Sequence, residues 1–372
     1  MTTTDRARLD GYFRRVVERF PSRVPAASLV ITHLLPERPA FLDALTQLAR
    51  VAAVLPKPKS QVPEVVDEVR RQYRVDQLDR DQFADPGQAL DYLEGTVPGE
   101  DLVLLDIGGY FAPSLDVLAG KFSGRILGVV EDTENGHRRY QSLATLPCPV
   151  YSVARSPLKE CEDHLVGHSV VFSTEALLRA HGSVLTNRDA CVIGYGKIGR
   201  SIARALHHRD VRVTVYDNDP VKQVQAHAHG FRVSARCSDA LRGADLVMCA
   251  TGNLALRRAV FGALHNGAYV ASVTSSDDEL ELASLEGAYR RTPLPHGTTR
   301  FATADHHFDV LNDGNAVNFL HGAEVGSYIH LVQAEILAAV SLIAAEQPPG
   351  LHEVSAEARH TIASIWLDRF SR

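Results

Sequence analysis

The sequence predicts a mixed α/β protein that contains two doubly wound parallel sheets. The segment 189–220 reads as a strand, a glycine-rich turn, a helix and a second strand, which is the repeating unit of such sheets. Short apolar runs also alternate with helical patterns through residues 1–155, before this segment begins. The chain has 372 residues, which is enough for two domains with separate cores. We therefore expect two Rossmann-like domains.

The first 155 residues predict a domain of their own. Its strands are expected at the apolar runs 27–32, 51–55, 102–106, 126–130 and 150–153. Its helices are expected over residues 5–20, 41–49 and 63–73. Polar side chains follow several of these strands, namely His33, Glu37, Asp106, Asp132 and Thr133. Open α/β sheets bind ligands at the carboxyl ends of their strands, so these side chains are candidate site residues.

Residues 191–199 contain the glycine pattern of a dinucleotide site. Gly194, Gly196 and Gly199 have the spacing GxGxxG between a strand and a helix. The first permits a tight turn, the second lets the backbone approach a pyrophosphate, and the third lets the helix pack closely on the strand. Asp217 ends the next strand, where a carboxylate binds ribose hydroxyls and repels a 2′-phosphate. The pattern predicts NAD rather than NADP; the alternative is a Rossmann-like unit that has lost its ligand.

The rest of the chain completes this second domain and adds terminal helices. Three further strands are expected at residues 231–233, 246–250 and 268–273. The middle strand ends in Thr251, Gly252 and Asn253, at a position that lies beside the cofactor in Rossmann domains. Helices are expected over residues 155–185, 320–342 and 362–370.

Composition excludes several classes of function. The net charge of −6 gives no basic footprint for nucleic acid. We expect no apolar run of membrane-spanning length and no signal-peptide core, and therefore a cytoplasmic protein without a membrane partner. The five cysteines form no CxxC pair, so neither a metal site nor a disulfide framework is indicated.

The order of these landmarks resembles the S-adenosylhomocysteine hydrolase family. The segments that carry the resemblance are LLDIGGY (104–110), GVVEDTENG (128–136), KECEDHLVG (159–167), VIGYGKIGR (192–200), VYDNDP (215–220), ATGN (250–253) and LNDGNAVNF (311–319). The resemblance implies an NAD-binding domain inserted into a substrate domain. It places the substrate domain at residues 1–165, the NAD domain at 166–320 and returning helices at 321–372. It also implies a homo-oligomer.

The resemblance further implies a small-molecule nucleoside substrate and a redox cycle. In this family a tightly held NAD oxidises the 3′-hydroxyl of an adenosine moiety, and the ketone acidifies the C4′ hydrogen. A base removes that hydrogen, the 5′ substituent leaves, water adds at C5′, and the ketone is reduced again. The cofactor ends unchanged, so it stays bound throughout.

Several residues match the family's catalytic positions. Lys159 and Asp163, four apart on one helix face, would contact the 2′- and 3′-hydroxyls, and Lys159 would help to remove the 3′-hydroxyl proton. His33 matches the histidine near the 5′ leaving group, Asp132 a ribose-binding glutamate, and Glu37 a residue that reads the adenine amino group. The predicted cofactor contacts are Gly194, Gly196, Lys197, Ile198, Gly199, Asp217, Thr133, His164, Thr251, Gly252, Asn253 and Asn318.

Other positions depart from the family. Ile107 stands where the family has a second aspartate, assigned to C4′ proton transfer, and Ser275 stands where it has a histidine. A glycine–histidine–proline segment is replaced by EVGS (324–327), and the C-terminal lysine/tyrosine tail is missing. These changes favour a lyase or dehydratase that leaves a 4′,5′-alkene, as in nucleoside natural-product metabolism. His33 would protonate the departing hydroxyl, and the base would be Asp106, Lys159 or an unidentified group.

Three alternatives stay open at this point. The first is thioether hydrolysis after all, with a neighbouring residue in the role of the missing aspartate. The second is a nucleoside dehydrogenase or 3′-epimerase. The third is a catalytically silent protein that binds NAD or a nucleoside and regulates a partner.

Overall fold

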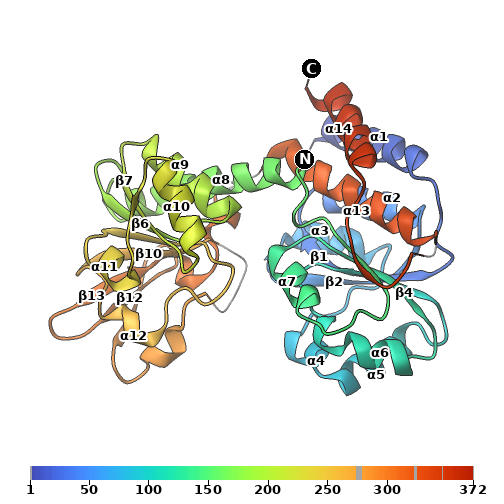
Figure 1. Ribbon diagram of the computed structural model, residues 1–372, viewed down its shortest axis with the longest axis horizontal. Helices are drawn as coiled ribbons and strands as arrows, with labels where there is room; N and C mark the ends of the chain where they lie inside the picture. The colour runs from blue at the N-terminus through green and yellow to red at the C-terminus, as the bar shows by residue number, and fades with distance from the viewer. Residues whose placement is uncertain (1, 274–278, 322–324, 346, 372) are drawn as a thin grey trace. The chain divides into compact units, whose positions relative to one another are not determined.

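The computed structural model describes residues 2–273, 279–321, 325–345 and 347–371. These residues form two compact units. Unit 1 comprises Met1–Lys159 and Ser327–Arg372, and unit 2 comprises Glu160–Gly326. Unit 2 is thus inserted into the sequence of unit 1, and in Figure 1 unit 1 contains both the blue start and the red end of the chain.

Unit 1 is built on a six-stranded parallel sheet with the order β14-β5-β4-β3-β1-β2. The strands are β1 (Ala27–Leu34), β2 (Arg50–Gln61), β3 (Leu102–Asp106), β4 (Ile126–Glu131), β5 (Pro149–Ser152) and β14 (Gly350–His352). From β1 the chain proceeds to β2 on one side and to β3 on the other. The strand order therefore reverses between β1 and β3, where doubly wound sheets bind their ligands.

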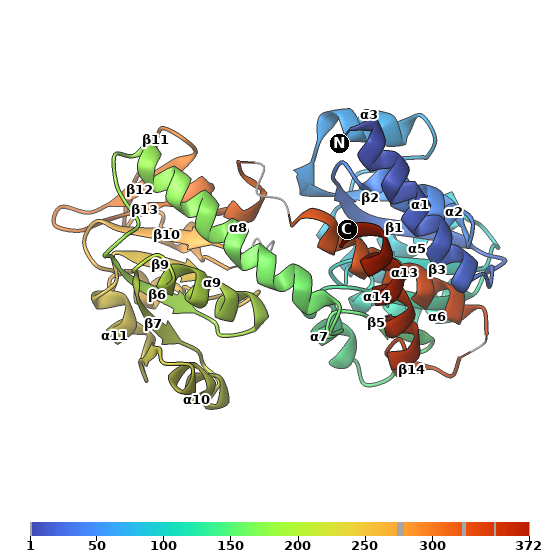
Figure 2. The ribbon, with the colours of Figure 1, turned by 90° about the horizontal axis from the view of Figure 1, so that it is seen from above.

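Helices cover both faces of this sheet, as Figures 1 and 2 show. One face carries α1 (Thr3–Arg19), α2 (Arg38–Thr46), α13 (Ile329–Ile343) and α14 (Ala356–Phe370). The remaining helices are α3 (Pro63–Arg70), α4 (Arg80–Ala84), α5 (Pro86–Thr96), α6 (Leu115–Lys121) and α7 (Glu134–Gln141). One apolar core of the unit includes Phe83, Leu93 and Leu115 from α4, α5 and α6 against Leu29 and Leu104 of the sheet.

The apolar helix α13 corrects one expectation from the sequence. The stretch Gly326–Ile343 is long and apolar enough to cross a membrane, judged by length and composition alone. However, 72% of that stretch is buried inside the protein. A helix that is apolar on all sides is typical of a core position as well as of a membrane span.

Unit 2 has an eight-stranded sheet with the order β11-β12-β13-β10-β9-β6-β7-β8. The strands are β6 (Asp189–Ile193), β7 (Arg212–Tyr216), β8 (Arg232–Val233), β9 (Leu246–Cys249), β10 (Ala268–Ser272), β11 (Arg290–Leu294), β12 (Thr298–Ala302) and β13 (His307–Val310). The neighbouring strands in the part β13-β10-β9-β6-β7-β8 of the sheet are parallel. Strand β12 pairs antiparallel with both β11 and β13. The predicted α/β class with Rossmann-type sheets is confirmed, whereas the antiparallel extension was not predicted.

The helices of unit 2 also lie on both faces of its sheet. The helices are α8 (Lys159–Ala180), α9 (Lys197–His207), α10 (Pro220–Ala228), α11 (Cys237–Arg242) and α12 (Arg258–Phe261). Val170 of α8 and Ile202 of α9 share one core with Val192 of β6. Leu241 of α11 and Phe261 of α12 share the other core, so the central strands are buried on both sides.

Candidate functional site

The glycine turn after β6 has little room for side chains at two of its positions. Gly194 has a φ of +94°, and a Cβ there would lie 2.6 Å from the carbonyl oxygen of Ala250. A Cβ on Gly199 would lie only 1.9 Å from the carbonyl oxygen of Gly194. Both contacts are shorter than van der Waals distances allow, so the turn and the close packing of α9 require glycine at these positions.

Gly196 differs from its two neighbours in the motif. It is exposed, and a Cβ there would meet nothing within 4 Å. Protein packing therefore does not demand a glycine at this position, but the close approach of a ligand would. Gly196 caps the N-terminus of α9, which begins with Lys197 and Ile198. The first N–H groups of a helix and its positive dipole end attract phosphate groups.

Asp217 lies directly after β7, beside this turn. Its carboxylate accepts hydrogen bonds from the backbone N–H groups of Tyr195 (2.6 Å) and Asp219 (2.9 Å). Gly194 N–H also donates to the carbonyl of Tyr216 (2.8 Å), which ties the turn to the same strand end. An ionised carboxylate has about four acceptor sites, so Asp217 can still accept ribose hydroxyls.

The loop after β9 is held by a glutamate that the sequence analysis missed. Glu279 is 1% exposed. Its carboxylate accepts hydrogen bonds from Thr251 N–H (2.6 Å), Thr251 Oγ1 (3.1 Å) and Gly252 N–H (3.3 Å), and also from Ser272 Oγ (3.1 Å). The threonine hydroxyl also donates to the carbonyl of Asn253. The loop 251–253, which is predicted to lie beside the cofactor, is therefore held by the buried Glu279 carboxylate.

Three other predicted residues of unit 2 have different surroundings. Asn318 follows a β-bridge between Ser272 and Ala316, and its Oδ1 is buried without a hydrogen-bond partner among the described residues. Lys197 forms an ion pair with Asp163 (3.7 Å), so this acid contacts the start of α9. His164 contributes its carbonyl oxygen to a hydrogen bond from Ser201 Oγ (2.5 Å). Ser275 lies outside the described residues.

In unit 1, two buried carboxylates hold the loop after β3. Asp106 accepts hydrogen bonds from the N–H groups of Tyr110 (2.8 Å) and Phe111 (2.9 Å) and from the Tyr140 hydroxyl. Glu131 at the end of β4 accepts hydrogen bonds from Gly108 N–H (2.9 Å) and Gly109 N–H (2.7 Å). With both oxygens of Asp106 engaged in this way, its geometry favours a positioning role over that of a base.

Glu131 is a second residue that the sequence analysis missed. It is fully buried, and burial together with the nearby carboxylates Asp106 and Asp132 raises its pKa to about 8. The N–H group of Thr133 (2.6 Å) also donates to Glu131 and opposes this shift. The sequence offers two adjacent acids, and only the strand register decides that Glu131 points into the protein.

Asp132 and Thr133 follow Glu131 at the same edge. Asp132 Oδ1 is a buried oxygen without a hydrogen-bond partner in the described part of the chain. Such an atom is costly unless a ligand or water supplies a donor. The hydroxyl of Thr133 caps α7 by accepting from Gly136 N–H (3.0 Å), so in this structure it performs a local structural role.

His33 lies at the end of β1, where the pairing between β1 and β2 is interrupted. Its Nδ1 shares a hydrogen bond with the Ser60 hydroxyl. Burial lowers the pKa of His33 well below its ordinary value, and the positive charges of Lys57, Arg38 and Lys159 act in the same direction. The imidazole is therefore neutral at physiological pH.

Lys57 is the third residue that the sequence analysis missed. It lies on β2 and is 7% exposed. Burial lowers its pKa, although Asp132, Glu131 and Asp106 pull the pKa back upward. The structure thus brings His33, Asp106 and Asp132 near an amine that no sequence motif had marked, and Lys159 is near His33.

Glu37 lies just before α2, in the same unit. Its Oε1 accepts a hydrogen bond from Gln333 Nε2 (3.4 Å) and lies 3.6 Å from the Arg38 guanidinium. These partners fix the carboxylate that the sequence analysis assigned to the adenine amino group.

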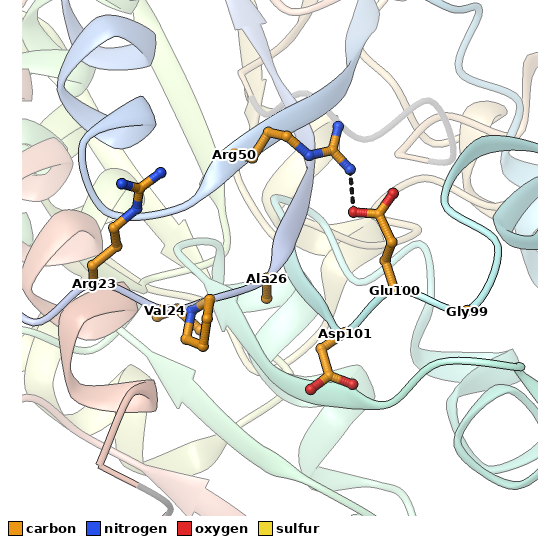
Figure 3. A pocket seen from close by; sticks show the side chains of 8 residues that line it. Arg23, Val24, Ala26, Arg50, Gly99, Glu100 and Asp101 are labelled. Atoms are coloured by element: carbon orange, nitrogen blue, oxygen red, sulfur yellow. Dashed lines mark hydrogen bonds and ion pairs between the residues drawn. The ribbon is translucent and has the colours of Figure 1, made fainter.

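A cavity of about 810 Å³ lies at the opposite edge of this sheet (Figure 3). It is lined by the segment before β1 and by residues at the starts of β2 and β3, and Arg50 forms an ion pair with Glu100 (2.5 Å) there. The amino ends of parallel strands are not where doubly wound sheets bind their ligands. We assign no role to this cavity.

The fold and the glycine turn of unit 2 define a Rossmann-type, NAD-binding domain. Residues 166–323 match the family model described as "S-adenosyl-L-homocysteine hydrolase, NAD binding domain". The chain is 26% identical over 250 residues to an adenosylhomocysteinase of Thermoplasma acidophilum, over 62% of this chain and 58% of that protein. It is 27% identical over 243 residues to an adenosylhomocysteinase of Acinetobacter baylyi, over 59% of this chain and 51% of that protein.

Residues 166–323 are therefore similar to the NAD-binding domain of S-adenosyl-L-homocysteine hydrolases, and the chain resembles adenosylhomocysteinases at low identity. The match spans little more than half the length of these two relatives. Among solved structures, a dipicolinate synthase chain of Bacillus halodurans aligns over 87% of this chain and 99% of its own length, at 11% identity and a TM-score of 0.45.

Proposed function

We propose that the protein binds NAD in unit 2 and an adenosine-like nucleoside in unit 1, and that it eliminates the 5′ substituent after transient 3′-oxidation. The observation that carries the proposal is the charged edge of unit 1. There Asp132 Oδ1 is buried without a hydrogen-bond partner in the part of the chain that the structure describes, and the Asp132 carboxylate is near the Lys57 amine. His33 is in turn near Lys57 and Lys159. A ribose hydroxyl would supply the donor that this oxygen lacks.

The residues of unit 2 fit NAD. Gly196 leaves open space at the start of α9, Asp217 presents a fixed carboxylate, and Asn318 Oδ1 is buried without a partner among the described residues. These three would hold the pyrophosphate, the adenosine ribose and the nicotinamide amide, respectively. When bound, NAD would accept a hydride from C3′ of the substrate and return it at the end of the cycle.

The residues of unit 1 would bind the nucleoside and move its protons. Asp132 would accept a hydrogen bond from a ribose hydroxyl, and Glu37 would accept one from the adenine amino group. Lys159 would take the 3′-hydroxyl proton, for which it must be neutral. The leaving group would depart from C5′ near His33.

The finer proposal is a lyase that leaves a 4′,5′-alkene. Ile107 is 2% exposed and packs in the core, so the position of the family's second carboxylate is apolar here. This departure supports an outcome that differs from ordinary hydrolysis.

One observation favours hydrolysis as the second candidate. The lowered pKa of His33 leaves a neutral imidazole, which suits the removal of a proton from water better than the protonation of a leaving hydroxyl. A neutral His33 would then activate the water that adds at C5′.

Incubation of the purified protein with adenosine or S-adenosylhomocysteine in deuterated water tests these proposals. We expect about one NAD per chain after denaturation, reduction of that NAD by adenosine, and an alkene product in the mass spectrum. Adenosine formed from S-adenosylhomocysteine, with deuterium at C4′, would instead identify a hydrolase. A ketone or an inverted 3′-centre would identify a dehydrogenase or epimerase. NAD that no nucleoside reduces would rule out all of these and indicate a regulator.

A further inference from the structure

We propose that Lys57 is the base that removes the C4′ proton, in place of the carboxylate that is missing at Ile107. This inference rests on the function proposed above. It identifies the group that the sequence analysis left open among Asp106, Lys159 and an unidentified residue.

The first argument is the path of β2. The pairing with β1 runs in register to Thr32 and Pro56, and it resumes at Leu34 and Gln61. A single residue of β1, His33, therefore faces the whole segment 57–60 of β2. This interruption is larger than an ordinary β-bulge, but like a bulge it redirects the side chains of the strand that carries the extra residues. Here the excursion brings Lys57 and Ser60 to the carboxyl edge of the sheet beside His33.

The second argument is the position of the amine. Lys57 Nζ lies 3.4 Å from the point where a Cβ on Gly108 would be, and 6.0 Å from the ring centre of Tyr110. Both residues belong to the loop that begins at Ile107. The amine therefore approaches the loop in which the family carries its proton-transfer carboxylate, but it does so from a different strand.

The third argument is the role of the other acids and bases around this amine. Asp106 of β3 and Glu131 of β4 are engaged by backbone N–H groups, and Arg80 of α4 lies over the Tyr110 ring, with its Cζ 3.9 Å from the ring centre. His33 of β1 is neutral, and Asp132 lacks a partner for Oδ1 among the described residues. Since the proposed function assigns Lys159 to the 3′-hydroxyl proton, Lys57 is left as the group that is buried, carried on a long side chain and able to lose a proton.

The lowered pKa of Lys57 supports this assignment. Burial is the main cause, and Arg80 acts in the same direction, while Asp132, Glu131 and Asp106 oppose it. Lysine changes its protonation state readily when it is buried, which is how lysines act as general bases. A lowered pKa increases the neutral fraction that can accept a proton near neutral pH.

The proton transfer balances without any further reagent. The Lys57 nitrogen lone pair takes the C4′ proton, which the 3′-ketone has made acidic. The C4′–H electron pair becomes the second bond between C4′ and C5′, and the 5′ substituent leaves with the electron pair of its own bond. The protonated Lys57 then returns its proton to solvent or to the departing group.

Lys57→Arg and Lys57→Met separate a base from a counter-ion. Arginine keeps the positive charge but cannot act as a base, whereas methionine keeps an unbranched side chain, one heavy atom shorter, without the charge. With adenosine as the probe, both variants should still reduce bound NAD. Their C4′ deuterium exchange should fall by about 10²- to 10⁴-fold, the usual contribution of a general base. Adenosine affinity, measured by calorimetry, should stay within a few-fold of the wild type.

Two further measurements keep the proposal testable if a variant does not fold. In the wild type, exchange should rise with pH, with an apparent pKa below the ordinary 10.5 of lysine. In Lys57→Ala, added methylamine should restore part of the exchange, because a small amine can occupy the space of the lost one.

The proposal is overturned if Lys57→Arg exchanges the C4′ hydrogen at the wild-type rate, since the lysine would then be a counter-ion. It is also overturned if the variants lose NAD reduction and adenosine binding together with exchange, because that pattern is structural. A wild-type protein in which no adenine nucleoside reduces NAD would refute the proposed function itself, which is a different result.

Discussion

The carboxyl edge of each sheet contains a loop whose backbone is held by a buried glutamate. In unit 1, Glu131 accepts hydrogen bonds from the N–H groups of Gly108 and Gly109. In unit 2, Glu279 accepts them from Thr251 and Gly252. Both acids are buried, so each edge has a loop that is tied to the protein interior by a glutamate.

The two edges differ in the groups that lie beside these glutamate-held loops. In unit 2, Gly196 opens onto empty space, and the nearby groups are backbone N–H groups and the Asp217 carboxylate. In unit 1, the amine of Lys57, the ring of Tyr110 and the imidazole of His33 gather at the edge. An edge of backbone donors suits the phosphates of a dinucleotide, whereas an edge of titratable side chains suits proton transfer.

The largest effect is expected for Gly199→Ala in unit 2. Its Cβ would lie 1.9 Å from the Gly194 oxygen, so α9 would have to move, at a cost of about 1–3 kcal/mol or more. We expect a lower melting temperature and no bound NAD. Gly196→Ala is the matched control, because its Cβ meets no protein atom within 4 Å. It should melt like the wild type and yet retain less NAD after gel filtration; full NAD retention would mean that the ligand does not approach this position.

Removal of the Glu131 or the Glu279 carboxylate should loosen the loop that each one holds in its own unit. Glu131→Gln, above about pH 8 where Glu131 is ionised, and Glu279→Gln each place an amide where backbone N–H groups donate to a carboxylate, which costs about 1–3 kcal/mol. Hydrogen exchange by mass spectrometry should show faster exchange of residues 106–111 in the first variant and of residues 251–253 in the second. Exchange that rises in neither loop would show that the glutamates do not hold them.

The pH dependence of stability should set Glu131 apart. Its pKa is about 8 in the folded protein against an ordinary 4.5. As the pH rises from about 4.5 to about 8, the unfolded chain loses this proton first, so the free energy of unfolding should decrease over that range. Urea unfolding at several pH values should show this decrease in the wild type and a smaller one in Glu131→Gln. If the free energy of unfolding changed equally with pH in the wild type and in Glu131→Gln, Glu131 would be ionised in the folded protein.

A smaller effect is expected for Asp217→Ala. The loss of its hydrogen bonds to ribose should weaken NAD binding by about 1.5–3 kcal/mol, and the loss of its charge should improve binding of NADP relative to NAD. Calorimetry with both cofactors on the protein stripped of NAD measures the ratio. An unchanged preference would assign the discrimination to another residue.

The smallest effect is expected for Ser60→Ala in unit 1. This variant removes the hydroxyl that hydrogen-bonds to His33, which is worth about 1 kcal/mol, or roughly a five-fold decrease in the rate of the proposed elimination. Steady-state kinetics with adenosine measures the decrease, with NAD content as the control. A rate identical to the wild type would show that the imidazole is held by other contacts.

The sequence predicted the parts of the fold that depend on local patterns. Gly194 and Gly199 are recognisable because their spacing follows from one turn and one helix. The strand ends that carry His33 and Asp132 were also predicted from a local pattern, the short apolar runs before them. The predicted fold class is confirmed. The strands β11, β12, β13 and β14 were not predicted; β11 is largely exposed and lacks an alternation of apolar and polar residues.

The missed site residues depend on contacts between distant parts of the chain. Lys57 reaches Gly108 from β2, although β1 lies between β2 and β3 in the sheet. Glu131 and Asp132 are adjacent acids, and only the strand register decides which one is buried. Glu279 comes after the last predicted strand, and it holds Thr251, which lies 28 residues earlier in the sequence. A single sequence contains no motif that shows which residues, far apart along the chain, come into contact in the fold.

The excursion of β2 between Pro56 and Gln61 also has a consequence for how this protein can change. Residues 57–60 have no paired residue on β1, while the pairs on either side of them are in place. Substitutions or small length changes in this segment are therefore expected to leave the β1–β2 pairs on either side of it in place. A library confined to residues 57–60 should yield many folded proteins, which makes this short segment a natural starting point for changing the residues beside His33.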